Sequence, residues 1–187
     1  MTSPFMWYLN RGTGVVLLGL LSMTTVLGIL ATGRQFSARW PRFVTQGLHR
    51  ALAGLSVALL LVHIVTAVVD EYVDIRWWQA LVPFGGTYKP LWLGLGALAL
   101  DLLIAVVITS LLRDRISPRL WFVVHLLAYA AWAVSVVHGL GIGSDSRRDW
   151  MVSLTLVCVS MVGAGALGRL GLGVAGWWQR RSIGGWP

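Results

Sequence analysis

Four histidines are the residues of this chain whose type and spacing could do chemistry, because all four lie inside long apolar stretches. Fourteen positions separate His49 from His63, and thirteen separate His125 from His138. Either spacing covers about 20 Å along a helix, which is most of the roughly 30 Å hydrocarbon core of a bilayer. Two imidazoles from facing helices can fill both axial positions of one iron porphyrin. The histidines therefore predict two haem groups at two levels.

The elements that must position these histidines are membrane-spanning helices. Of the 187 residues, 57% are hydrophobic and 12% are charged, which excludes an ordinary soluble domain. Five apolar stretches reach the roughly 20 residues that a membrane helix needs, and they cover residues 14–32, 45–69, 91–112, 119–140 and 150–172. We predict an all-α integral membrane bundle of five transmembrane helices, forming a single domain over residues 1–187. The first stretch is too long for a cleaved signal peptide, so we expect it to remain.

Charged residues in the connections predict the topology. Arginines gather in alternate connections and in the tail: Arg34, Arg39, Arg42 and Arg50, then Arg113, Arg115 and Arg119, then Arg180 and Arg181. The other connections balance acids such as Asp70, Glu71 and Asp145 against bases. Because cytoplasmic loops are enriched in Lys and Arg, the N-terminus should be extracytoplasmic and the C-terminus cytoplasmic. The same bias explains the net charge of +8, so we expect membrane lipid and no nucleic acid as a partner.

This topology sorts the histidines into two pairs. The helices at 45–69 and 119–140 run in the same direction, so His49 and His125 share the inner level, and His63 and His138 share the outer level. Iron held by two histidines keeps no open position for a substrate, so it would pass single electrons. The alternative is a haem-free protein whose histidines bind another metal or form hydrogen bonds between helices.

Three segments resemble a known family: "LHRALAGLSVALLLVHIV", "YKPLWLGLGALALDLL" and "FVVHLLAYAAWAVSVVHGLGIGSDSR". Over roughly residues 12–170 the chain resembles the ferric reductase-like transmembrane domain family, and short actinobacterial members most of all. That family includes the membrane core of NADPH oxidases and ferric reductases, and the haem subunit of a periplasmic methionine sulfoxide reductase. The resemblance implies two haems b, with iron ligands His49 and His125 for the inner haem and His63 and His138 for the outer.

The resemblance also implies a function and a location. It implies an oxidoreductase subunit in a bacterial plasma membrane that conducts electrons outward and needs a partner. The donor would be a separate cytoplasmic flavoprotein or quinol, and the acceptor an extracytoplasmic redox partner protein or ferric iron. About fifteen residues follow the last predicted helix, so we expect no FAD or NADPH site within this chain. The GxGxxG match at 163–168 lies inside a predicted helix, where close helix packing explains it better than nucleotide binding.

A few other polar residues could serve the same chemistry. Haem propionates need donors, and Arg50 and Arg119, with Arg42, are candidates at the inner level, whereas Lys89 and Tyr88 are candidates at the outer level. Asp101 lies near the predicted bilayer midplane, where a carboxylate is costly. It could form a structural hydrogen bond, tune a haem, or take a proton from a quinol, so a quinol-oxidising cytochrome stays open.

Overall fold

The computed structural model describes residues 4–31, 41–70 and 73–183, and the side chains of 172–183 lie outside the described part. Residue 32, Arg34, Arg39 and Glu71 also fall outside it, as do the side chains of Arg180 and Arg181. The described residues contain helices and no strands. These helices are α1 (Pro4–Ala31), α2 (Arg42–Val69), α3 (Trp77–Leu81), α4 (Pro90–Leu111), α5 (Pro118–Ile142), α6 (Asp149–Ile183) and a 3-10 turn at Arg113–Arg115.

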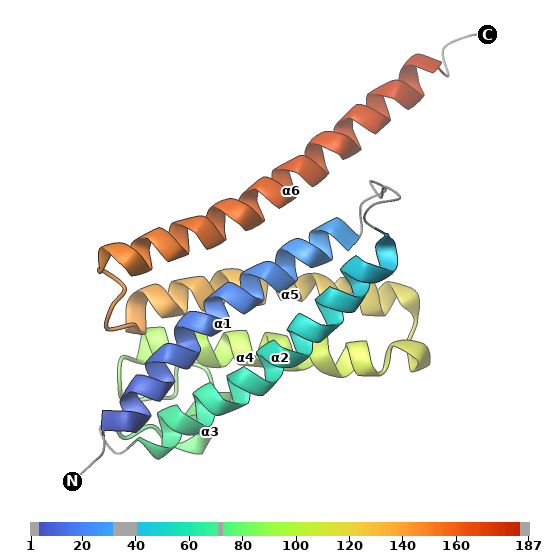
Figure 1. Cartoon of the computed structure of the whole chain (residues 1–187). Helices are drawn as coiled ribbons and strands as arrows, with labels where there is room; N and C mark the ends of the chain where they lie inside the picture. Colours follow the sequence, from blue (N-terminus) through green and yellow to red (C-terminus); the bar gives the residue numbers. More distant parts are fainter. Residues whose placement is uncertain (1–3, 32–40, 71–72, 184–187) are drawn as a thin grey trace.

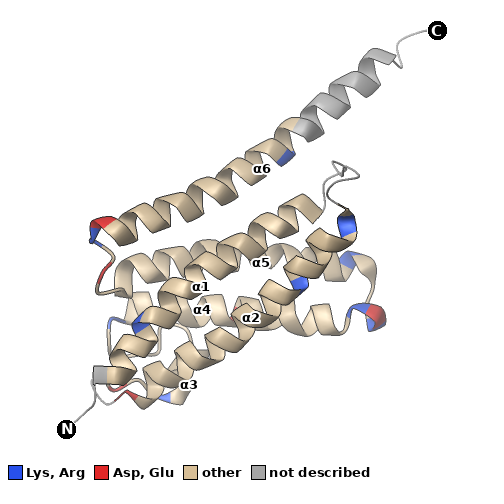
Figure 2. Ribbon diagram, in the orientation of Figure 1, with Lys and Arg blue, Asp and Glu red and all other residues tan. Residues whose placement is uncertain are grey.

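Five of these helices are long and apolar enough to cross a membrane, namely α1, α2, α4, α5 and α6. The all-α fold with five membrane-spanning helices is therefore confirmed at the level of length and composition. Large apolar side chains lie on the outside of the bundle, as a lipid-facing surface requires: Leu55, Leu61, Ile108 and Leu156 are all exposed. Figure 2 shows most charged residues at the helix ends and in the connections. The chain is a multi-pass membrane protein by these criteria.

The helix boundaries differ from the predicted ones at two places. The first helix begins at Pro4 rather than at residue 14, because its polar residues Asn10 and Arg11 find partners inside the protein. The last helix continues to Ile183. The short helix α3 was absent from the prediction. Other boundaries agree closely, since proline opens both α4 and α5, and the Ser117 hydroxyl caps α5 by accepting from the Leu120 N–H at 3.2 Å.

Two helical hairpins form the bundle. Helix α1 packs along α2, α4 packs along α5, and α1 also contacts α5 and α6 (Figure 1). Because each hairpin reverses the chain once, α2 and α5 run in the same direction, as predicted. In α6, Gly165 faces α1, and a Cβ built there would lie 3.4 Å from Ile29 Cδ1. The glycine motif at 163–168 thus lies in a helix that packs on another helix.

A hydrogen bond crosses the middle of the bundle. Trp132 on α5 donates its indole N–H to Ser22 Oγ on α1 at 2.9 Å. Ser22 is fully buried, and so is Ala131 beside Trp132. This contact ties one hairpin to the other through their apolar centre, where an unpaired N–H would be costly.

Replacing Trp132 with Phe should lower the thermal stability of the protein in detergent. The substitution keeps most of the ring but removes the bond to Ser22, which corresponds to about 0.5–1 kcal/mol. Trp150→Phe is the matched control, because Trp150 is half exposed at the start of α6. The measurement is the Tm of both variants against the parent chain. An equal Tm for the two variants would show that the Trp132 bond contributes nothing measurable.

Candidate cofactor site

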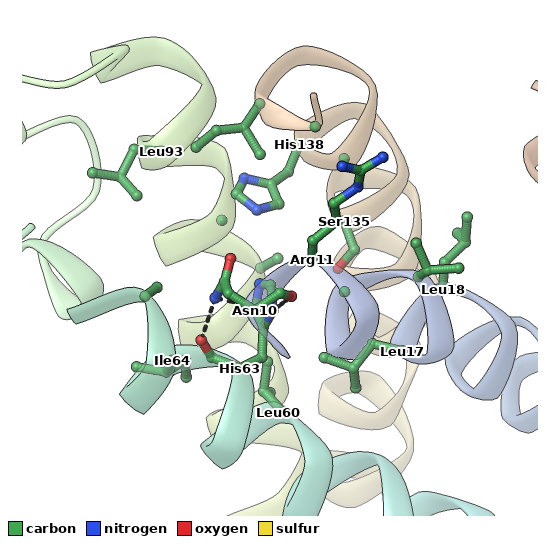
Figure 3. Close-up of a pocket in the computed structure, with 18 of the residues that line it drawn as sticks. Asn10, Arg11, Leu17, Leu18, Leu60, His63, Ile64, Leu93, Ser135 and His138 are labelled. Carbon is green, nitrogen blue, oxygen red and sulfur yellow. Dashed lines mark hydrogen bonds between the residues drawn. The ribbon is translucent and has the colours of Figure 1, made fainter. Parts of the chain in front are cut away.

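The four histidines lie in two pairs between the two hairpins. The rings of His49 on α2 and His125 on α5 have centroids 6.2 Å apart and planes inclined at 61°. His63 on α2 and His138 on α5 line one cavity of about 520 Å³. Figure 3 shows these two side chains approaching the same space from facing helices. Each level of the bundle therefore offers two imidazoles, one from α2 and one from α5.

Hydrogen bonds fix the orientation of the imidazole rings. The Nδ1 atoms of His49 and His63 lie 3.0 Å from carbonyl oxygens of α1, those of Thr24 and Asn10 respectively. His138 Nδ1 lies 2.7 Å from the Trp92 carbonyl of α4. A carbonyl can only accept, so Nδ1 must carry the proton in these three rings. The other nitrogen, Nε2, then keeps its lone pair and can bind a metal.

His125 is held differently from the other three histidines. Its Nδ1 lies 3.4 Å from Ser110 Oγ of α4, a hydroxyl that can donate or accept. Its ring stacks on Trp121, with centroids 4.8 Å apart and planes inclined at 23°. The guanidinium of Arg113 lies 4.5 Å from the centroid of the Trp121 ring, on a cation–π contact. The orientation of His125 therefore depends more on stacking than on a strong hydrogen bond.

Glycines let three of the rings pack against a helix backbone. A Cβ built at Gly14 would lie 3.1 Å from His63 Cε1, and one at Gly28 would lie 3.3 Å from His49 Cε1. At Gly96 the corresponding distance to His138 Cε1 is only 2.6 Å, which no real side chain could occupy. Helices α1 and α4 thus supply both the carbonyl acceptor and the space that each ring needs.

Asn10 adds a second connection between α1 and His63. Its amide nitrogen donates to the His63 carbonyl at 2.7 Å (Figure 3). It also donates to Thr66 Oγ1 at 3.2 Å. Thr13 Oγ1 lies 3.2 Å from His63 Nδ1. Prediction from the sequence missed Asn10 and Thr13, because both precede the first apolar stretch. Their spacing of three residues, which puts them on one helix face, was the available signal.

The mouth of the outer cavity is polar. Lys89 and Tyr88, predicted at the outer level, line the cavity together with His63 and His138. Lys89 Nζ lies 5.8 Å from the Tyr88 ring centroid. Arg11, which the sequence did not single out, also lines it and pairs with the buried carboxylate of Asp145. The predicted outer donors therefore belong to the same cavity as the outer histidines.

The predicted inner donors are not brought to the inner pair. Arg50 and Arg119 are exposed, and no hydrogen bond or ion pair in the described part of the chain joins either to His49 or His125. Both side chains lie on outward faces of their helices. Instead, Arg113, the residue after the C-cap of α4, contacts the ring of Trp121, which stacks on His125. Trp121 Nε1 is buried there without a hydrogen-bond partner.

Each level of the bundle brings two histidines together. Among residues 4–31, 41–70 and 73–183, no group of three or more His, Cys, Asp or Glu side chains could hold a metal ion. A bare zinc site needs three or four protein ligands. An iron porphyrin needs only two, because the macrocycle supplies the other four. The donor set therefore fits a haem better than an isolated metal ion.

The fold and the site together define a helical multi-pass membrane protein with paired intramembrane histidines. A family model described as "Domain of unknown function (DUF8596)" matches residues 5–145. The match covers most of the chain, so the chain belongs to this family. It spans α1 to α5 and includes all four histidines, whereas α6 begins after it. No curated protein matches the chain.

A double-mutant cycle should reveal the bond between Asn10 and Thr66. Asn10→Leu and Thr66→Val each remove one partner, so the destabilisation of the double variant should fall short of the sum by about 0.5–1 kcal/mol. Thermal or denaturant unfolding of the detergent-solubilised protein measures these values. Thr109→Val is the matched control, because Thr109 bonds only within α4, and its effect should add to that of Asn10→Leu. Additive effects in both cycles would argue against a direct contact.

Proposed function

We propose that this chain is a ferric reductase-like membrane cytochrome that holds two haems b and conducts electrons across the membrane. The observation that carries the proposal is the orientation of the histidines. Three of the four rings donate Nδ1–H to a carbonyl of a neighbouring helix, as metal-bound histidines usually do. At the outer level both rings, His63 and His138, are held in this way, and a histidine that only linked two helices by a hydrogen bond would not need the second ring.

The spacing of the inner pair supports axial ligation. An imidazole nitrogen binds a transition metal at about 2 Å and lies about 1.1 Å from its own ring centroid, so two rings on opposite sides of one metal have centroids about 6 Å apart. The centroids of His49 and His125 are 6.2 Å apart. This separation matches the one expected for two rings that hold one iron between them.

The outer cavity supports the second haem. Its volume of about 520 Å³ lies within the roughly 300–1,000 Å³ of cofactor pockets. His63 and His138 would hold the iron, and Arg11 and Lys89 at the mouth would pair with the anionic propionates. At the inner level, the free N–H of Trp121 and the guanidinium of Arg113 are the donors nearest to His125. Arg50 and Arg119 would instead help to set the membrane topology as basic residues on the cytoplasmic side.

Bound haem supplies one-electron redox chemistry, and the protein positions it. The histidines of α2 and α5 would close both axial positions and so exclude oxygen and substrates from the metal. The carbonyls of α1 and α4 would keep Nε2 of His49, His63 and His138 unprotonated and ready to bind. The apolar side chains around the pairs would keep water away from the path between them.

The charge distribution supports electron transfer from the cytoplasmic side outward. The end of the bundle that carries the inner pair has Arg42, Arg113, Arg115 and Arg119 with Asp114 as its acid, whereas the other end mixes both signs (Figure 2). By the positive-inside tendency, the arginine end is cytoplasmic and both the N-terminus and the outer pair face outward. In a bacterial plasma membrane, a separate flavoprotein or quinol would then donate electrons to the inner haem. An extracytoplasmic redox protein or ferric iron would accept them at the outer haem.

The direct test is the haem content of the purified protein. The pyridine haemochrome assay, with a reduced minus oxidised spectrum, should give two low-spin haems b per chain. His63→Ala and His63→Ala with His138→Ala should each retain one haem, because both variants damage only the outer pair. His63→Ala with His125→Ala should retain none, because it takes one ligand from each pair. Colourless protein after reconstitution with haem would refute the proposal, and a haem retained in the last variant would refute the pairing.

Gly96→Val should reduce the outer haem alone. The new Cβ would meet the His138 ring, so the ring would turn and His138 would no longer hold the outer iron. We expect loss of about one haem per chain. Gly54→Val is the matched control, since nothing lies within 4 Å of a Cβ built at Gly54, and it should keep both haems. Full haem content in Gly96→Val would show that the His138 ring does not pack on α4 as described.

A further inference from the structure

An ion pair lies at the outer end of the bundle, beside the candidate site of the second haem. Arg11 belongs to α1, and Asp145 belongs to the connection between α5 and α6. The two side chains pair with each other, and that of Asp145 is only 10% exposed. Because a buried carboxylate is costly without a partner, Asp145 depends on Arg11. The pair ties the connection between α5 and α6 to α1.

Two contacts fix the direction of the Arg11 guanidinium. One is the ion pair with Asp145. The other is a cation–π contact, since the guanidinium carbon of Arg11 lies 4.8 Å from the centroid of the Trp7 ring. A guanidinium has five N–H donors, and a carboxylate accepts two of them in a bidentate pair. Arg11 therefore keeps donors for a second anion while Asp145 holds it in place.

The pair belongs to the wall of the outer cavity. Of the described charged side chains, four line this cavity: Arg11, Asp70, Lys89 and Asp145. Lys89 is exposed, so water and salt screen its charge. Asp145 is buried, and Figure 3 shows its partner Arg11 at the cavity together with His63 and His138. The charges of the pair should therefore act more strongly on a group in the cavity than the charge of Lys89.

The two charges have opposite effects on the reduction of a haem. Reduction adds one electron to ferric iron, so a nearby cation favours the reduced state and a nearby anion favours the oxidised state. We propose that Arg11 and Asp145 tune the reduction potential of the outer haem in opposite directions, and that Asp145 is a positioning residue that fixes Arg11 and offsets its charge. This inference rests on the proposed function, because it needs a haem held by His63 and His138.

Redox titration of the purified full chain with haem bound tests this inference. The haem spectrum is recorded at each applied potential, and the outer haem is the component that His63→Ala lacks. Asp145→Asn should raise the midpoint potential of the outer haem, and Arg11→Gln should lower it. Each should change the ratio of ferrous to ferric outer haem at the parent midpoint by about threefold or more. The two substitutions combined should return the potential close to the parent value.

Control variants separate the effect of charge from that of structure. Asp149→Asn is the matched control, because Asp149 is exposed at the start of α6 and does not line the cavity, so it should shift neither haem. The inner haem is the internal reference, because the spacing of the histidines places it about 20 Å away along the helices. Arg11→Lys and Asp145→Glu keep both charges and should leave the potential of the outer haem close to the parent value.

Shifts of Asp145→Asn and Arg11→Gln in the same direction would overturn the inference, because they would report a broken link and not a lost charge. So would unshifted potentials, an equal shift of the inner haem, or loss of the outer haem from either variant. If either variant fails to fold, Arg11→Lys and Asp145→Glu decide, and a shift in one of them overturns the inference. A parent chain without haem would refute the proposed function, whereas two haems without opposite shifts would refute only this inference. In haem-free protein, a double-mutant cycle on Tm should still show coupling between Arg11 and Asp145, and additive effects would refute the pair itself.

Discussion

The hydrogen bond from imidazole Nδ1 to a backbone carbonyl of the adjacent helix is the interaction on which the site depends. A helical carbonyl already accepts from the N–H four residues later, but its oxygen has a second lone pair. Helix α1 uses this capacity twice, at Asn10 and Thr24, and α4 uses it once, at Trp92. Few other hydrogen-bond acceptors are available to a buried N–H in an apolar bundle. The histidine helices α2 and α5 therefore each require a backing helix, and the two hairpins follow from that need.

Glycine in the adjacent helix is also needed for this hydrogen bond. A carbonyl of the backing helix is reachable only where its backbone comes close to the ring, and Gly14, Gly28 and Gly96 allow that approach. In the sequence these glycines look like ordinary packing residues of membrane helices. Their role is visible only from the structure, since it depends on which helix lies opposite. The pairs of histidines were predictable from their spacing and from the parallel direction of their two helices, but the residues that orient the rings were not.

Prediction from the sequence worked where one physical signal dominates. Hydropathy located the membrane helices, and the predicted starts at residues 91 and 119 lie one residue after the prolines that open α4 and α5. It was less successful where polar residues are satisfied by tertiary contacts, as at Asn10 and Arg11, which seemed to lie before the first helix. Arg50 and Arg119 were candidate donors to haem propionates at the inner level, and the structure shows both side chains exposed. Exposure depends on helix rotation, which the sequence pattern does not determine.

The remaining polar residues of the membrane helices show why Asp101 stands apart. Ser22, Ser56, Thr66 and Ser135 each donate to the carbonyl four residues earlier in their own helix. A hydroxyl can lie in the apolar interior in this way because it needs only one acceptor, which its own helix provides. A carboxylate cannot, because it needs donors, and a helix interior has none free. These four hydroxyls are thus satisfied within their own helices and the histidines through neighbouring helices, whereas no hydrogen bond or ion pair in the described part of the chain involves the carboxylate of Asp101.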